Sequence, residues 1–516
     1  MNKITKNEQR CEGNVITATM RVSIAVVVIK MLGFIKQVVI ASRFGASVET
    51  DAFFISTGVI GSLANVVFSA ISITLLSIYT QRVENVGKAK AGLVISATLK
   101  VFIPISFLLG LSFALFAPVV GKILAPSYEG AALNILVSYI RIMAGGFIFN
   151  CYYLTLNVIL ESDKRFLPGK GQAFFQNFFL ILAAVFFSNH FGVKALVVAY
   201  IMSFVAQCIL IRICTLKRYK FEFNTVECRT DIQKLLKLSL PLIVGNAVYE
   251  INDIVDKQIS SGLGNGGASI LSYGASINEI VTTVIIMSLS TVLYAYYASW
   301  VAKGQYERIG KNIIKSIEYL TVIITPILVV CLICGKDIVE IIYGRGNFGE
   351  LQIEQTYRVM VGYAVGFMFQ AARATIVKVF YAFNNTKIPM VNGTISVGFN
   401  IILSIILSHV MGVAGISLAT SISMLIATVL LIVRLPLFIK GFSLYSSIPE
   451  YIKSFVAGAI SLICLVLLYR NTDFTLYIRV IAGIILVMFI YMIILILLKS
   501  KCSCELINIC KKRLLK

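Results

Sequence analysis

Charged residues are scarce in this sequence, and acidic residues are the scarcest. Only 14% of the 516 residues are charged, with 24 Asp and Glu against 46 Lys and Arg. A soluble domain normally carries about 25% charged residues. Hydrophobic residues make up 58% of the chain, and its mean hydropathy is +0.89. The longest polar stretch, near residues 212–237, is too short for a separate domain. The composition therefore excludes a soluble protein.

Signatures of catalysis and cofactor binding are also missing. The chain has no Walker A lysine motif, and its two histidines, His190 and His409, stand alone. The eleven cysteines form neither a zinc-ligand pattern nor a disulfide framework. Residues 262–267 match G-x-G-x-x-G, but they join two apolar segments where a dinucleotide site needs a preceding strand. We therefore expect no catalytic residue, no metal and no cofactor.

Long apolar segments, by contrast, recur along the whole chain. Each is long enough to cross a bilayer as a helix, the conformation in which a segment satisfies its own backbone in lipid. The sequence thus predicts an all-α polytopic membrane protein with about fourteen transmembrane helices. The predicted segments are 16–41, 51–79, 91–117, 130–159, 167–189, 192–213, 236–260, 268–299, 313–334, 355–383, 388–408, 411–433, 451–469 and 475–498.

The distribution of Lys and Arg predicts the orientation. Basic residues concentrate in alternate loops and in both tails, which places the N- and C-termini in the cytoplasm. The same bias accounts for the net charge of +22 without a nucleic-acid partner.

An internal repeat predicts two lobes. Residues 144–150 (AGGFIFN) resemble residues 364–370 (AVGFMFQ), and each stretch is followed by a turn that ends in proline, Pro168 or Pro389. We expect an N-terminal lobe at 1–220 and a C-terminal lobe at 221–440. Residues 441–516 would hold two further helices and a basic cytoplasmic tail. Two six-helix lobes related by a parallel repeat are typical of alternating-access transport.

Charged residues inside the apolar segments are the candidate site, because a charge at membrane depth usually faces a cavity or a partner. Glu250, Asp253 and Lys257 share one face of a predicted helix, and Asp256 points away from it. Two interpretations remain open: an internally paired structural cluster, or a cavity wall that handles a substrate or coupling ion. The candidates for cavity or coupling charge are Glu250, Asp253, Asp256 and Glu279.

Buried cations outnumber nearby acids, which favours an anionic ligand such as a diphosphate. Snorkelling of long side chains to the interface is the alternative for residues near helix ends. The candidates for substrate binding are Lys30, Lys36, Asp51, Arg141, Lys257 and Arg373.

Several local motifs resemble the MurJ/MviN family of the multidrug/oligosaccharidyl-lipid/polysaccharide exporter superfamily. They begin with KMLGFIK at 30–36 and TDAFF at 50–54. LPL at 240–242, YGRGNF at 343–348 and TKIP at 386–389 continue the likeness.

The resemblance implies a V-shaped, two-lobed transporter in the bacterial inner membrane. It implies movement of lipid II between leaflets, a cationic cavity for the diphosphate, and a groove for the lipid tail beside the last two helices. The family usually has arginine at the positions of Lys30, Lys36, Ala64 and Ser276, so the cationic constellation is only partly present here. It also has Glu-Gly-Ala-Phe where this chain has SAIS at 69–72.

We therefore expect a flippase, not an enzyme, for an undecaprenyl-diphosphate-linked saccharide: lipid II or a related cell-envelope polysaccharide precursor. The alternatives are a multidrug or cation antiporter of the same superfamily and a non-transporting scaffold in envelope assembly. The expected partners are the lipid-linked saccharide and membrane lipids, around a monomeric protein. Association with envelope-synthesis enzymes and the identity of a coupling ion stay open.

Overall fold

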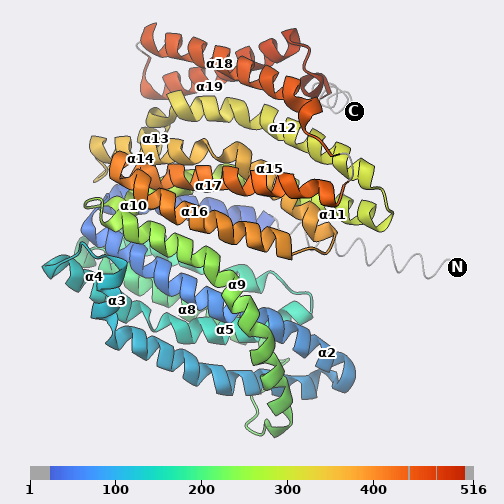
Figure 1. Ribbon diagram of the computed structural model, residues 1–516. Coiled ribbons are helices and arrows are strands. Elements are labelled where there is room, and N and C mark those ends of the chain that lie inside the picture. The colour runs from blue at the N-terminus through green and yellow to red at the C-terminus, as the bar shows by residue number, and fades with distance from the viewer. Residues whose placement is uncertain (1–23, 440–441, 472–473, 506–516) are drawn as a thin grey trace. The chain divides into compact units, whose positions relative to one another are not determined.

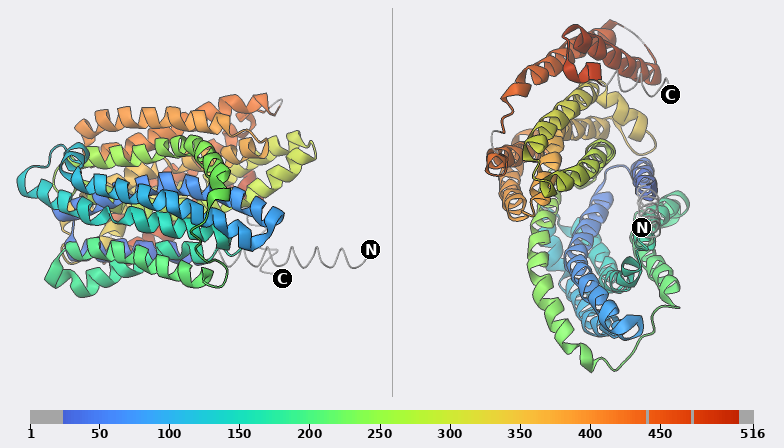
Figure 2. Two further views of the ribbon diagram at one scale, coloured as in Figure 1. Left: turned by 90° about the horizontal axis from the view of Figure 1, so that it is seen from below. Right: turned by 90° about the vertical axis from the view of Figure 1, so that its right-hand side faces the viewer.

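The computed structural model describes residues 24–439, 442–471 and 474–505. These residues form helices joined by turns, with no strand among them (Figure 1 and Figure 2). The prediction of an all-helical membrane protein is confirmed.

Helix α2 (Val48–Leu115) is the longest element, at 68 residues. At 1.5 Å per residue it would span about 100 Å if straight, which is several times the hydrocarbon core of a bilayer. Gly87, at φ 81° and ψ 165°, interrupts the helix, and the chain reverses its direction there (Figure 1). Glycine adopts this conformation without the steric cost that a side chain brings. Two predicted segments, 51–79 and 91–117, therefore occupy the two arms of α2.

Contacts divide the chain into two units, the first ending at Ser269 and the second beginning at Ile270. In unit 1, α5 and α9 pack along α2, and α6 packs on α8. After the first described helix (Ile24–Phe44) and α2, its α-helices are α3 (Ala117–Leu124), α4 (Gly130–Met143), α5 (Gly146–Ser162), α6 (Gly171–Leu182), α7 (Ser188–Phe191), α8 (Lys194–Thr215) and α9 (Arg229–Ser261).

Unit 2 packs α17 against α14, α15 and α16, and it packs α18 against α12 and α19. Its core includes Tyr297, Ile376 and Phe380, all almost fully buried. The α-helices are α10 (Gly267–Val281), which begins at the end of unit 1, α11 (Ser288–Ala302), α12 (Tyr306–Ile333), α13 (Gly335–Tyr343), α14 (Glu350–Ala364), α15 (Phe367–Ala382), α16 (Lys387–Met411), α17 (Val413–Arg434), α18 (Ile448–Asn471) and α19 (Leu476–Leu497).

Eleven helices in the described residues are long and apolar enough to cross a membrane, or up to twelve if the bent pair α14–α15 is one span. The sequence predicted about fourteen. Part of the difference arises because α2 counts once although its length allows two crossings. Helix α9 does not qualify, since its second half carries charged residues such as Glu250, Asp253 and Lys257.

The two units differ from the predicted lobes in one respect. Helix α9 lies beyond the predicted boundary at residue 220, yet it packs against α2 and belongs to unit 1. The lobe boundaries stay a prediction.

One ion pair attaches the last helix to the rest of unit 2. Arg479 in α19 donates two hydrogen bonds to Asp337 in α13, from Nε and Nη2, each at 2.7 Å. The guanidinium also lies 5.2 Å from the centre of the Tyr469 ring. A bidentate pair of this kind fixes orientation as well as distance. It therefore determines how the final helix is placed against α13.

A close contact between α16 and α17 generates a prediction. A Cβ atom added at Gly415 would lie 2.2 Å from the carbonyl oxygen of Leu407, a backbone atom that cannot rotate away. Gly415→Ala should lower the free energy of unfolding by about 1–3 kcal/mol, measured by thermal unfolding of the purified protein in detergent. Gly398→Ala in α16 is the matched control, because nothing lies within 4 Å of its added Cβ. Equal thermal stability of the two variants would contradict this packing.

Candidate functional site

The predicted charge cluster of α9 lies against α2 within unit 1. Lys257 Nζ is 2.6 Å from Asp253 Oδ2, one helical turn earlier. The lysine amine also packs on Gly58 of α2, where an added Cβ would lie 2.4 Å from it. The Lys257 side chain is only 16% exposed, whereas that of Asp253 is 51% exposed. The structure thus shows Lys257 paired with Asp253, as an internally paired cluster would have it, and a role in substrate binding stays a prediction.

The contact between α9 and α2 continues along both helices. Asn65, two turns beyond Gly58 on α2, donates from Nδ2 to Glu250 at 3.5 Å. On the other side of α9, Asp256 is buried and accepts from Asn252 at 3.3 Å. Three of the four predicted cavity acids therefore lie on α9 beside polar partners. Their assignment as coupling charges remains a prediction.

Asp51 lies in the first turn of α2 and is fully buried. Its carboxylate accepts hydrogen bonds from the Gly266 and Ser269 backbone N–H groups, both at 2.7 Å, and from the Ser269 hydroxyl at 2.6 Å. Ser269 lies in the first turn of α10, where N–H groups have no intrahelical acceptor. Asp51 thus caps α10 from the beginning of α2, which joins segments more than 200 residues apart.

The loop that approaches Asp51 needs glycine. Gly266 has φ 90°, and an added Cβ would lie 2.8 Å from the Ala46 carbonyl oxygen. Tyr128 completes the arrangement by donating to Asp51 Oδ2 at 3.3 Å. Burial, together with the nearby Asp51 carboxylate, raises the pKa of the Tyr128 hydroxyl. The tyrosine therefore keeps its proton and remains a donor. This geometry gives Asp51 a structural part, and its contact with substrate stays a prediction.

Lys30 and Lys36 lie on the first described helix, which packs on α6. Asn177 of α6 donates to the Ile29 carbonyl at 3.1 Å, and it lies 3.2 Å from a Cβ built on Gly33. Lys30 is exposed and Lys36 is half-buried. The predicted pair thus flanks a close helix contact.

Arg141, another predicted cation, is exposed and donates from Nε to the Ala114 carbonyl at 3.3 Å. That carbonyl would normally accept from the residue four positions later, but Pro118 has no N–H. The hydrogen bond therefore satisfies a carbonyl at the end of α2.

Arg373 differs from the predicted cations Lys257 and Arg141 in its hydrogen bonding. It is half-buried in α15, and its Nε atom is fully buried without a hydrogen-bond partner in the described part of the chain. Arg373 lies nine residues before the end of α15, or about 14 Å along the axis, within the bent pair α14–α15 that could form one membrane span. Lys378 on the same helix instead lies over the rings of Tyr294 and Tyr381.

The remaining acid, Glu279 in α10, is exposed, and its carbonyl accepts from the Thr282 hydroxyl at 3.1 Å. Within the described ranges, no group of three or more His, Cys, Asp or Glu residues could hold a metal ion. The structure thus forms two separate groups from the predicted residues: the charges of α9 lie beside α2, and Asp51 caps the start of α10.

Sequence reasoning missed the partners Gly58, Asn65, Tyr128 and Ser269. Gly58 and Asn65 are seven residues apart and so share one helix face, a signal that could have suggested these two partners. No comparable signal in the sequence marks the other two.

Comparison with known proteins now identifies the family. Residues 40–498 match the family model described as "Lipid II flippase MurJ", which is most of the chain. The chain belongs to the MurJ lipid II flippase family. It is therefore a multi-pass membrane transporter of this family and not an enzyme.

Family relatives share about a quarter of their residues with the chain. A probable lipid II flippase MurJ of Treponema pallidum is 25% identical over 434 residues, which cover 82% of each chain. A probable lipid II flippase MurJ of Buchnera aphidicola is 25% identical over 425 residues, covering 80% of this chain and 81% of the relative.

Solved structures show the same fold. A lipid II flippase MurJ in an inward closed conformation gives a TM-score of 0.79 at 22% identity, covering 92% of this chain and 97% of that one. An inward-facing multidrug transporter of the MATE family gives a TM-score of 0.65 at 14% identity, covering 81% and 96%. The MurJ family member described here thus shares its fold with the wider superfamily.

The cap made by Asp51 predicts a loss of stability in Asp51→Asn. An amide would turn one donor toward the N–H groups of Gly266 and Ser269, which leaves a buried polar group unsatisfied. We expect the free energy of unfolding to fall by about 1–3 kcal/mol, measured as a lower Tm in detergent. Glu49→Gln, two residues earlier and exposed, is the control and should leave Tm unchanged. A Tm for Asp51→Asn equal to that of the control would rule out the cap.

The Lys257–Asp253 pair predicts non-additive effects. Asp253→Asn leaves a largely buried ammonium group without its carboxylate. The free energy of unfolding should fall by about 1 kcal/mol, a moderate loss because the Asp253 side chain is half exposed. The double variant Asp253→Asn/Lys257→Gln removes both charges and should recover most of that loss. A double-variant cycle from thermal unfolding measures the coupling. Purely additive effects would show that the pair contributes nothing.

Proposed function

We propose that this chain moves an undecaprenyl-diphosphate-linked saccharide from the cytoplasmic to the outer leaflet of the bacterial inner membrane. The substrate is lipid II, the cargo named for its relatives, or a related cell-envelope polysaccharide precursor. Transport by alternating access makes and breaks no covalent bond. Family membership supports the transport step, and the charges inside the helices support an anionic headgroup.

The observation that carries this proposal is the buried Nε atom of Arg373, which has no hydrogen-bond partner in the described residues. A charge inside a membrane-spanning helix is costly unless it meets a partner, water or a ligand. Lys257, by contrast, is bound to Asp253, and Arg141 is bound to a backbone carbonyl. A planar guanidinium matches two phosphate oxygens at once. These features support Arg373 as a contact of the diphosphate.

Lys30 and Lys36 are the further substrate contacts in the proposal. Each carries a compact charge that suits a phosphate as a point contact, without the fork of arginine. Asp51, Arg141 and Lys257 complete the proposed set, although their hydrogen bonds and ion pairs give them structural parts as well.

One observation favours a second candidate, a cation antiporter. Asp253 and Glu279 expose carboxylates on helices of the transport fold, and such groups could take up a proton or another cation. Within the proposed flippase, the same acids, with Glu250 and Asp256, would serve a coupling ion. The transported molecule separates these roles, because a flippase moves the lipid whereas an antiporter moves a cationic drug.

We further propose that both termini lie in the cytoplasm and that the protein acts as a monomer. Three loops predicted to be cytoplasmic meet at Asp163, which binds Lys88 at 2.6 Å and Arg218 at 3.0 Å. Their shared location at one end of unit 1 supports a single cytoplasmic surface rich in Lys and Arg.

The test replaces Arg373 in cells depleted of their own lipid II flippase. Wild-type protein should restore lipid II translocation, and Arg373→Gln should lower the rate at least tenfold because a charge-assisted contact to the headgroup is lost. Arg373→Lys should retain part of the rate. Translocation is measured as lipid II accessible at the outer face, with protein level in the membrane measured alongside.

Arg358→Gln is the matched control, because that arginine is exposed and bound to Glu354. It should translocate like wild type. Full activity of Arg373→Gln at normal protein level would contradict the substrate contact. Failure of the wild type to move lipid II would instead direct the assay to another polyprenyl-linked precursor.

A further inference from the structure

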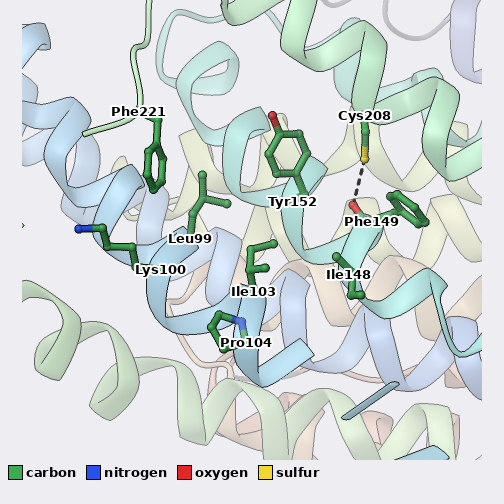
Figure 3. A pocket seen from close by; sticks show the side chains of 9 residues that line it. All are labelled: Leu99, Lys100, Ile103, Pro104, Ile148, Phe149, Tyr152, Cys208 and Phe221. Carbon is green, nitrogen blue, oxygen red and sulfur yellow. Dashed lines mark hydrogen bonds between the residues drawn. The ribbon is translucent and has the colours of Figure 1, made fainter. Parts of the chain in front are cut away.

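Unit 1 contains a pocket that the transport proposal does not use. Its volume is about 600 Å³, within the range of small-molecule sites. Helices α2, α5 and α8 and the segment after α8 form its walls (Figure 3). The lining residues are Leu99, Lys100, Ile103, Pro104, Ile148, Phe149, Tyr152, Cys208 and Phe221.

The pocket interior is apolar. The Cys208 thiol donates to the Phe149 carbonyl at 3.3 Å, so the polar groups of this pair already satisfy each other. Figure 3 places Pro104 toward one end of the pocket, and Phe221 and the Tyr152 hydroxyl toward the other. Such an interior suits a hydrocarbon chain, since it offers no polar partner for a hydrophilic ligand.

One cation lines the pocket, and a second lies next to the pocket wall on α8. Lys100 lines the rim, and its ammonium nitrogen points away from the apolar side chains (Figure 3). Arg212 lies one helical turn beyond Cys208 and donates to the Tyr219 carbonyl at 3.4 Å. In the described residues neither cation has a carboxylate within ion-pair distance. Glu222, the acid of this segment, is exposed and uses its backbone N–H to reach Ser96.

The depth of these cations matches a lipid headgroup. Lys100 lies fifteen residues before the end of α2 at Leu115, or about 22 Å along the helix. Arg212 lies eighteen residues after the start of α8 at Lys194, or about 27 Å. Because the hydrocarbon core is about 30 Å thick, Arg212 lies near the interface that is cytoplasmic in the predicted orientation, and the long side chain of the deeper Lys100 can extend toward it. The apolar walls extend from there toward the bilayer centre.

The segment after α8 closes this end. The Tyr219 hydroxyl is 2.8 Å from Ser96 Oγ on α2, which anchors the segment across the pocket. Phe221 and Phe223 then stack edge to face with ring centres 5.1 Å apart, and the Lys100 amine lies 5.4 Å from the Phe223 ring. The aromatic rings thus hold the lysine at the rim.

We propose that this pocket binds one acyl chain of an anionic glycerophospholipid, with Lys100 and Arg212 contacting its phosphate. The occupant is a resident lipid of the cytoplasmic leaflet and not the transported one. The charge at the rim selects an anionic headgroup, and the apolar walls hold the chain. The site is separate from Arg373, which lies in the other unit.

Fluorescence quenching in vesicles tests this site with the full chain. The chain has one tryptophan, Trp300, so Trp300→Phe with Phe221→Trp places a single fluorophore on the pocket. The protein is reconstituted in phosphatidylcholine vesicles that contain dibrominated phosphatidylglycerol or dibrominated phosphatidylcholine. We expect the phosphatidylglycerol to bind roughly 25-fold more tightly, because each of the two basic residues contributes about fivefold.

Lys100→Gln should bring this preference down about fivefold, and adding Arg212→Gln should abolish it. Lys90→Gln is the matched control: it removes an exposed lysine of the same helix outside the pocket and should keep the full preference. An unchanged tryptophan emission maximum in the variants shows that the pocket is intact.

Three results would overturn the proposal. Equal quenching by the two brominated lipids would mean that ordinary boundary lipid covers the pocket. A preference that persists in Lys100→Gln with an intact emission maximum would place the charge selection elsewhere. Displacement by undecaprenyl diphosphate at lower concentration than by phosphatidylglycerol would assign the pocket to the transported lipid's tail. None of these results depends on transport activity.

Discussion

The fold depends on finding partners for a few charged side chains inside apolar helices. An isolated charge in lipid is costly, so each one must be paired, hydrogen-bonded or kept for a ligand. Asp51 meets this constraint by accepting two backbone N–H groups and a hydroxyl, all within 2.7 Å. The cap joins the start of α2 to the start of α10. A single carboxylate therefore determines where two distant segments meet in unit 1.

The same constraint separates structural charges from candidate functional ones. Lys257 is bound to Asp253 on its own helix, and Arg141 satisfies a backbone carbonyl. The buried Nε of Arg373 has no such partner in the described chain. A buried guanidinium nitrogen without a protein partner suits an anionic headgroup, which carries its own charge to the site. The proposed lipid pocket follows the same logic, since Lys100 and Arg212 have no carboxylate partner among the described residues.

Much of the architecture could be predicted from the sequence, because long apolar segments must become helices in lipid. The ion pair of Asp253 and Lys257 could also be predicted, since their i,i+4 spacing on a helix alone brings the two side chains together. The contacts of Asp51 with Ser269 and of Asn65 with Glu250 were not, because they join residues about 200 positions apart. Likewise, an arginine in a helix gives no sign of being unpaired until its neighbours on other helices are known.

The central claim is that cations within the helices of this fold, Arg373 above all, recognise a diphosphate. The most direct test compares binding of undecaprenyl diphosphate and of the uncharged alcohol undecaprenol to the purified protein. The account predicts tighter binding of the diphosphate and a smaller difference between the two lipids in Arg373→Gln. Equal affinity of the wild-type protein for both lipids would contradict it, since the prenyl chain alone would then account for binding.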